Sequence, residues 1–167
     1  MNPSDVIKRT FIFNSLNDRE VEDILRISRE RRFSKGEIIT QEGEQGDSMY
    51  ILFDGNVEVS KTLTMKLEEG DVREREKILT RFKAEDNLVF GEMAMIDREN
   101  RSASVVTTTD CTLLEIERED FLGLLEKRPQ MGVKILRGLA ELLASRLRQS
   151  SQDVIRLTTA LSIALGS

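Results

Sequence analysis

The segment that decides the fold spans residues 90–104 and reads Phe90-Gly91-Glu92-Met93-Ala94-Met95-Ile96-Asp97-Arg98-Glu99-Asn100-Arg101-Ser102-Ala103-Ser104. An apolar run leads into Gly91, and the pattern after it predicts a short helical turn, then a polar loop that returns to a strand at Val105-Val106. Glycine lets a backbone approach a ligand closely. A helix start after Gly91 directs backbone N–H groups outward, which favours binding of an anion.

Two charged residues in this segment have complementary chemistry. Arg101 can hold a phosphate through two parallel hydrogen bonds. Glu92 is repelled by an anion, but it can accept a hydrogen bond from a hydroxyl such as the 2′-OH of a sugar. The small residues Ala94, Ser102 and Ala103 leave room between them. The segment therefore predicts a site for a sugar phosphate.

Short apolar runs with turn signals between them surround this segment. Gly-containing turns such as Lys35-Gly36, Asp54-Gly55 and Glu69-Gly70-Asp71 separate the runs, which is typical of an all-β sandwich or barrel. Residues 61–82 are expected to form a long hairpin that turns at residues 69–71. The runs lie at residues 38–39, 49–53, 57–59, 63–67, 78–82, 88–90, 105–106 and 113–116.

Helices are predicted on both sides of the strands. Asn17 and Glu20 match a capping box for a helix over residues 18–29, and apolar residues in 6–16 indicate a shorter helix and turn before it. A helix is expected over residues 117–127, and Pro129 fits the first turn of another.

Charge divides the chain into two parts. Residues 129–167 carry five basic and two acidic residues, a net of +3, which leaves a net of −8 in residues 1–128. We therefore expect a body over residues 1–128 and a C-terminal helical arm over residues 129–167. The acidic body argues against nucleic acid as a partner.

Composition excludes several kinds of site. The chain has no His and one Cys, which removes His-based catalysis, imidazole metal sites and an intramolecular disulfide. An enzyme on a His-rich barrel is excluded for the same reason, so we expect no enzyme and no metal. The start of the sequence lacks a signal-peptide pattern, and no uncharged run reaches the length of a membrane span, so the expected location is the cytoplasm.

The ordered motifs resemble the cyclic nucleotide-binding domain family, which includes regulatory domains of cAMP-dependent kinases, cyclic-nucleotide-gated channels and catabolite activator proteins. The family's phosphate-binding cassette, Phe-Gly-Glu-Leu-Ala followed by Arg-Ala-Ala-Thr, reads here as residues 90–94 and 101–104. The entry to the strands also matches, at residues 33–39, 41–43, 46–52 and 55–59. The resemblance covers residues 11–128 and implies a mainly β fold with flanking helices (α+β), a β-roll of the jelly-roll kind.

The resemblance also implies the ligand contacts. It assigns Glu92 to the ribose 2′-OH and Arg101 to the cyclic phosphate, with backbone N–H groups near Ala94 and Ser102 also facing the phosphate. Met93 and strand residues are expected to line the apolar part of the pocket. The full set of implied ligand-binding residues is Phe90, Gly91, Glu92, Met93, Ala94, Arg101, Ser102 and Ala103.

Three positions depart from the family pattern. Asn100 stands where many members have Pro, residues 84–87 replace a Gly-Asp turn, and Ser102 replaces the common Ala. A hydroxyl at residue 102 occurs in binders of both nucleotides, so the ligand is expected to be cAMP or cGMP, with no further cofactor.

Several alternatives remain open on sequence alone. Glu92 and Arg101 could form only a solvated surface ion pair, or the chain could be a degenerate interaction module that keeps the fold without the nucleotide. A DNA-binding regulator would need a reading head after the arm, and only 17 residues follow Ser150.

The arm offers a means of output. The leucines of the arm would be exposed unless something packs against them. Either the arm packs on its own β-roll as a lid, or it packs against the same helix of a second chain in a coiled coil. We expect a homodimer through this helix, together with an unidentified effector. The seam consists of Leu136, Leu139, Leu143 and Leu147, and its spacing resumes at Val154, Leu157, Leu161 and Leu165.

Overall fold

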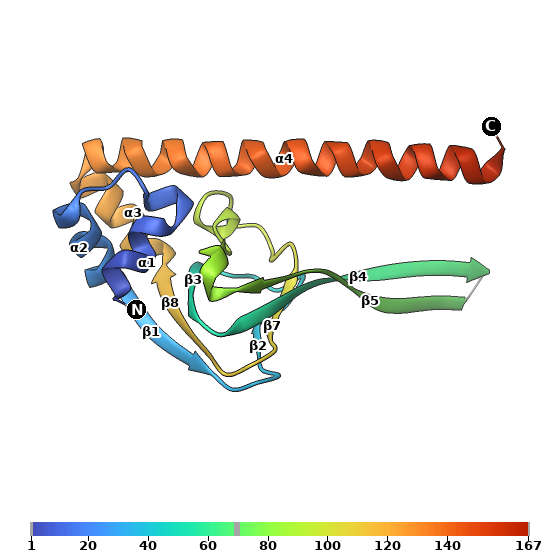
Figure 1. Cartoon of the computed structure of the whole chain (residues 1–167), viewed down its shortest axis with the longest axis horizontal. Helices are drawn as coiled ribbons and strands as arrows, with labels where there is room; N and C mark the ends of the chain where they lie inside the picture. Colours follow the sequence, from blue (N-terminus) through green and yellow to red (C-terminus); the bar gives the residue numbers. More distant parts are fainter. Residues whose placement is uncertain (1, 69–70, 167) are drawn as a thin grey trace.

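A computed structural model describes residues 2–68 and 71–166, with side chains described outside residues 63–75. Two four-stranded antiparallel sheets stand beside a group of helices built from both ends of the chain (Figure 1). The sheets have the strand orders β1-β8-β3-β6 and β2-β7-β4-β5. This is the expected β-roll with flanking helices. The strands are β1 (Ser28–Phe33), β2 (Ile38–Thr40), β3 (Ser48–Asp54), β4 (Asn56–Glu68), β5 (Asp71–Lys83), β6 (Val89–Phe90), β7 (Ser104–Thr107) and β8 (Cys111–Glu117).

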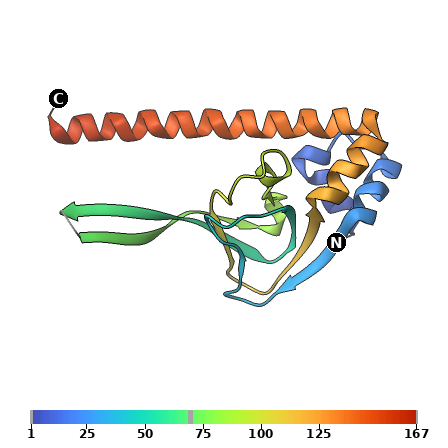
Figure 2. The same ribbon diagram turned by 180° about the vertical axis from the view of Figure 1, so that it is seen from behind.

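The helices flank the strands in sequence and pack together in space, as Figure 2 shows from behind. Asn17 caps α2 with the expected capping box: its side chain accepts from Glu20 N at 3.0 Å, and Asn17 N donates to Glu20 Oε2 at 2.8 Å. Pro129 begins α4, as predicted. The helical elements are α1 (Pro3–Arg9), η1 (Phe11–Phe13), α2 (Asp18–Ile27), η2 (Ala84–Asp86), η3 (Met93–Met95), α3 (Arg118–Lys127) and α4 (Pro129–Leu165).

The core lies on both faces of β3 and β8. Met49 and Ile51 point into a cluster shared with the helices, whereas Tyr50 and Leu52 point into a second cluster between the two sheets. Successive side chains of a strand face opposite sides. A strand that is buried on both sides therefore reads as an unbroken apolar run, which is why residues 49–53 stood out in the sequence.

Some predicted boundaries were wrong, and one strand was not predicted. Helix α2 ends at Ile27 rather than at residue 29, because Ser28 already belongs to β1 and pairs with Ile116. Strand β1 was not among the predicted runs, since it lies at a sheet edge and four of its six residues are exposed. The runs at 57–59 and 63–67 form one 13-residue strand, β4.

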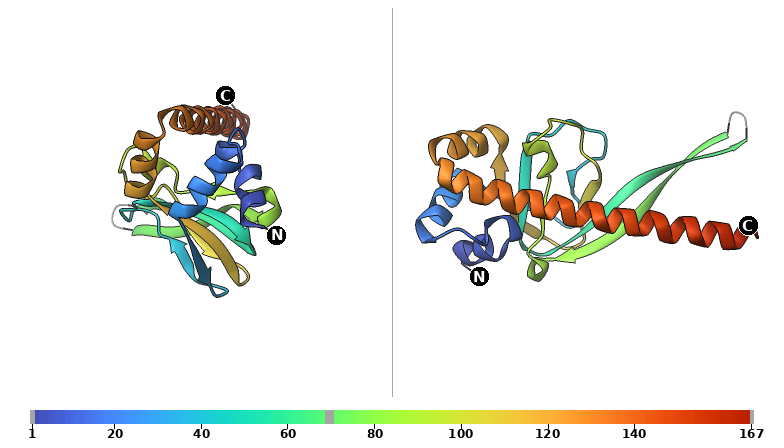
Figure 3. Two further views of the ribbon diagram at one scale, coloured as in Figure 1. Left: turned by 90° about the vertical axis from the view of Figure 1, so that its left-hand side faces the viewer. Right: turned by 90° about the horizontal axis from the view of Figure 1, so that it is seen from above.

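The long hairpin is confirmed, and it extends from Asn56 to Lys83. Of its predicted turn at residues 69–71, positions 69 and 70 lie outside the described residues. Both strands project beyond the roll in the same direction as α4 (Figures 1 and 3).

Helix α4 is continuous over 37 residues, about 55 Å at the usual rise. Its first part belongs to the core, where Met131, Ile135 and Leu139 are buried against the N-terminal helices. Gly138 permits the close crossing, because a Cβ there would lie 3.0 Å from the carbonyl oxygen of Ile12. Arg146 is the last residue of the helix shown here to contact the body, and beyond it the helix is mostly exposed. Within the described residues, no helix has the length and apolar character needed to cross a membrane.

Candidate functional site

The predicted cassette wraps one end of a pocket. Strand β6 leads into Gly91, which has a φ of +77°, and the expected short helical turn follows as η3. Gly91 suits this conformation because L side chains rarely adopt it.

The loop after η3 is held by a second loop. Asn100 forms an isolated β-bridge with Gln45, and Arg101 N donates to the Glu44 carbonyl at 2.8 Å. Gly43 N in turn donates to the Arg101 carbonyl at 2.9 Å. These bonds hold the backbone of Arg101 in place at the pocket.

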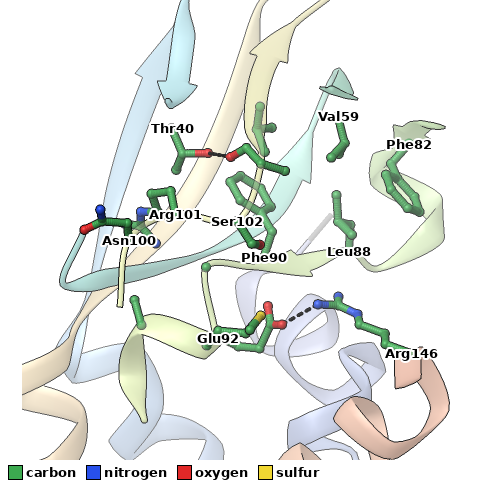
Figure 4. A pocket seen from close by; sticks show the side chains of 15 residues that line it. Thr40, Val59, Phe82, Leu88, Phe90, Glu92, Asn100, Arg101, Ser102 and Arg146 are labelled. Atoms are coloured by element: carbon green, nitrogen blue, oxygen red, sulfur yellow. Dashed lines mark hydrogen bonds and ion pairs between the residues drawn. The ribbon is translucent and has the colours of Figure 1, made fainter. Parts of the chain in front are cut away.

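The pocket has a volume of about 230 Å³, and all eight predicted ligand-binding residues line it. In Figure 4, Val59, Phe82 and Leu88 gather on one side, Arg101 and Asn100 lie on the other, and Glu92 meets Arg146 below them. The pocket therefore has a charged end and an apolar wall. Its lining comprises Thr40, Val59, Phe82, Leu88, Phe90, Gly91, Glu92, Met93, Ala94, Asn100, Arg101, Ser102, Ala103, Val105 and Arg146.

Arg101 lies against the end of β3. Its Nη1 donates to the Ser48 carbonyl at 2.7 Å and its Nη2 to Ser48 Oγ at 3.2 Å. Because a guanidinium has five N–H groups, these two bonds leave donors of the fork for an anion in the pocket.

Glu92 is 1% exposed, and Arg146 of α4 pairs with one of its oxygens. The other oxygen, Oε2, is buried and has no hydrogen-bond partner among the described residues. Burial raises the pKa of Glu92, although the positive charges of Arg146 and Arg101 oppose this rise. A buried carboxylate oxygen without a donor is costly, so this position suits a ligand hydroxyl.

This geometry excludes one alternative from the sequence. Glu92 is not a solvated surface residue, and its ion-pair partner is Arg146 rather than Arg101. The two cassette residues are thus separate features of one pocket.

Sequence reasoning missed Arg146. Its Nη2 also donates to the Val89 carbonyl at 3.0 Å, so it ties α4 to the strand that enters the cassette. A signal was present, because Arg146 continues the helix face that carries Ile135, Leu139 and Leu142 at steps of four, three and four residues. A basic residue on a face that packs against the body indicates a buried anionic partner.

The other missed lining residues are mostly apolar or small, and those in strands come from the β2-β7-β4-β5 sheet. Val59, Phe82, Leu88 and Val105 were predicted only as strand residues, and Thr40 was not singled out. Their place in the pocket depends on which strands become neighbours, and strand neighbours are a tertiary property.

Comparison with known proteins agrees with this geometry. Residues 30–128 match the family model described as "Cyclic nucleotide-binding domain". The chain is 30% identical to the cyclic AMP receptor protein of Thermus thermophilus over 89% of its own length and 62% of that protein. It is 31% identical to a cGMP-dependent protein kinase of Plasmodium berghei over 87% of its length and 16% of the kinase.

A solved structure shows the same architecture. The crystal structure of the Thermus thermophilus catabolite activator protein superposes with a TM-score of 0.72 at 31% identity, over 88% of this chain and 62% of that one. The chain thus spans 62% of the length of the Thermus thermophilus cyclic AMP receptor protein. Because the family model covers more than half of the sequence and includes the whole cassette, the chain belongs to the cyclic nucleotide-binding domain family.

Proposed function

We propose that the chain is a sensor that binds a 3′,5′-cyclic purine nucleotide in this pocket and transmits binding through α4, rather than an enzyme. The single observation that carries the proposal is the buried Oε2 of Glu92, which lacks a donor in the pocket that also holds Arg101. Arg101 would receive the cyclic phosphate, with backbone N–H groups near Ala94 and Ser102, and Glu92 would receive the ribose 2′-OH. The apolar wall would cover the base.

We favour cAMP over cGMP. The chain covers 62% of the Thermus thermophilus relative, which is named a cyclic AMP receptor protein, but only 16% of the cGMP-dependent kinase of Plasmodium berghei. Titration calorimetry of the full chain with cAMP and with cGMP tests the proposal directly. Binding of either supports it, and binding of neither favours the degenerate interaction module.

The ribose contact gives a sharper test. The 2′-deoxy analogue of cAMP should bind more weakly by about 1–2 kcal/mol, because Glu92 Oε2 would again lack a donor. Calorimetry on the two nucleotides under one buffer condition measures the difference. Equal affinity would show that Glu92 does not contact the ribose.

The Glu92–Arg146 contact supports the proposed transmission through α4. A ligand hydroxyl that donates to Oε2 shares the Glu92 carboxylate with Arg146, which is bound at the other oxygen, and so changes the strength of the contact that holds α4 at the pocket. A ligand can shift a conformational equilibrium only through such a differential contact. We place the sensor in the cytoplasm, because its single Cys forms no disulfide that would need an oxidising compartment.

The structure also bears on whether the arm packs on its own β-roll or against the helix of a second chain. Of the predicted seam, Leu139 is buried in the body and Leu143 is packed against it, whereas Leu136 and Leu147 are 44% and 69% exposed. The body thus covers only the first part of α4. Farther along, a stripe with alternating steps of three and four residues is exposed after Leu143, which is the pattern of a coiled-coil seam. The stripe consists of Ala140, Leu143, Leu147, Ser150, Val154, Leu157, Leu161 and Ala164.

We propose that a second copy of the chain covers this stripe. Leu157→Glu should then convert a dimer to a monomer in sedimentation velocity, because it places a charge in the seam. Ile155→Glu is the matched control, since Ile155 lies off the stripe and is 65% exposed against 68% for Leu157. A wild-type chain that is monomeric at high concentration would exclude the dimer and leave α4 to an effector protein.

A further inference from the structure

A chain of buried polar groups runs from the pocket to the edge of one sheet. It begins at Arg101, whose Nη2 donates to Ser48 Oγ at 3.2 Å. Ser48 Oγ donates to Tyr50 Oη at 3.1 Å, and Tyr50 Oη donates to Glu115 Oε1 at 2.8 Å. Arg31 Nη1 closes the chain by donating to Glu115 Oε2 at 3.0 Å.

The strand register brings these groups together. Ser48 and Tyr50 are two residues apart on β3, so they face the same side, and Tyr50 pairs directly with Glu115 on β8. Arg31 lies on the neighbouring edge strand β1. The side chains of Ser48, Tyr50 and Glu115 are nearly enclosed, since these residues are 5%, 8% and 8% exposed.

The direction of every bond in this chain is determined by its two ends. Arg101 can only donate and a charged Glu115 can only accept, so each of the two hydroxyl groups accepts one bond and donates the next. Burial, with the Glu115 charge as a smaller contribution, raises the pKa of Tyr50, so its hydroxyl keeps the proton that it donates. A network in which each member is satisfied is rigid.

The same tyrosine also supports the guanidinium with its ring. Arg101 lies over the Tyr50 ring at 5.9 Å from the centroid, and that ring stacks on Phe90 at 5.4 Å and 24°. Gly46 and Gly91 flank the guanidinium, because a Cβ at either position would overlap it. Arg101 is thus held in a slot whose floor is Tyr50.

Packing alone does not require these polar groups. A buried ion or hydroxyl costs free energy unless it is paired, and apolar residues of similar volume are often as stabilising. A buried tyrosine–glutamate pair is therefore better explained by a role in orienting a third side chain than by packing. Arg101 is the one member of the chain that lines the pocket.

We propose that Tyr50 and Glu115 are positioning residues that hold the Arg101 guanidinium in the orientation that receives the ligand phosphate. The proposal rests on the proposed function and deepens it. Neither residue touches the ligand, so both act through Arg101. The orientation matters because a guanidinium that is already fixed loses less rotamer freedom when it binds.

Tyr50→Phe tests this, because it keeps the ring and removes only the hydroxyl. We expect the affinity for cAMP to fall about three- to tenfold, the usual effect of one hydrogen bond. In an Arg101→Ala background the same change should have no further effect, since the residue through which it acts is absent. Ser60→Ala is the control, because it deletes a hydroxyl that is also buried but bonds Glu76, which is not a member of the chain from Arg101 to Glu115.

A second readout separates positioning from a general structural role. In the two phosphorothioate diastereomers of cAMP, sulfur replaces one or the other of the two exocyclic oxygens of the phosphate. An Arg101 guanidinium with a fixed orientation should distinguish them. Tyr50→Phe and Glu115→Gln should reduce this discrimination, while the preference for cAMP over 2′-deoxy-cAMP, which reports Glu92, stays unchanged.

The outcomes are distinguishable. If wild type binds cAMP and Tyr50→Phe changes neither the affinity nor the discrimination between the diastereomers, this inference is overturned but the proposed function is not. An equal loss of affinity in the presence and absence of Arg101 also overturns it, because the effect would not pass through Arg101. Wild type that binds neither cyclic nucleotide removes the proposed function and this inference with it.

Discussion

Arg101→Ala should weaken cAMP binding by about 2–5 kcal/mol, the cost of removing one charged partner from a partly dry site. Its two hydrogen bonds to Ser48 hold the guanidinium at the charged end of the pocket. Without it, no other residue of the lining except Arg146 carries a positive charge, and Arg146 is paired with Glu92. Calorimetry with cAMP on both chains measures the loss.

Arg101→Lys is the matched control for charge. Lysine keeps a positive charge but lacks the planar fork that bonds Ser48 through two nitrogens. Its affinity should lie between wild type and Arg101→Ala. If Arg101→Ala retained wild-type affinity with its thermal unfolding unchanged, the phosphate would lie elsewhere and the proposed arrangement would be wrong.

The features that could be predicted from the sequence are those encoded locally. The cassette is one contiguous segment, so its glycine, turn and charged residues could be interpreted together. The capping box of α2 and the Pro start of α4 are also local, and both are confirmed. Strand β3 was readable because burial on two faces leaves an unbroken apolar run.

The features that were missed depend on pairing over long distances in the chain. Arg146 meets Glu92 across 54 residues, and although the helix face of Arg146 indicates an anionic partner, nothing in the sequence indicates that this partner is Glu92. Tyr50 and Glu115 are separated by 65 residues and are joined only by the β3–β8 register. Strand β1 lacks apolar alternation because it is an edge, so its pairing with β8 alone makes it a strand.

Glu92→Gln should change stability and ligand binding in opposite directions. Because burial raises the pKa of Glu92 above its ordinary value, the folded chain binds this proton more tightly than the unfolded chain. The contribution of Glu92 to stability is therefore most favourable below the ordinary carboxyl pKa, and it is lost as the pH rises through the folded pKa. At neutral pH the buried charge is a net cost.

The neutral amide removes that cost while keeping the shape of the side chain. Arg146 loses its partner, but it is 42% exposed and can return to water. We expect the ligand-free Glu92→Gln chain to be more stable than wild type by roughly 1–2 kcal/mol at neutral pH. The difference should shrink toward acidic pH, where Glu92 in wild type becomes protonated. Denaturant unfolding of both chains across this pH range measures it.

The same substitution should weaken cAMP binding about tenfold, because a hydrogen bond to a charged acceptor is replaced by one to a neutral acceptor. It should also reduce the preference for cAMP over its 2′-deoxy analogue. A gain in stability together with a loss of affinity would mean that Glu92 is retained at a cost to the ligand-free fold, as expected of a binding group. A variant that is less stable than wild type at neutral pH would show instead that the Glu92–Arg146 pair stabilises the ligand-free fold.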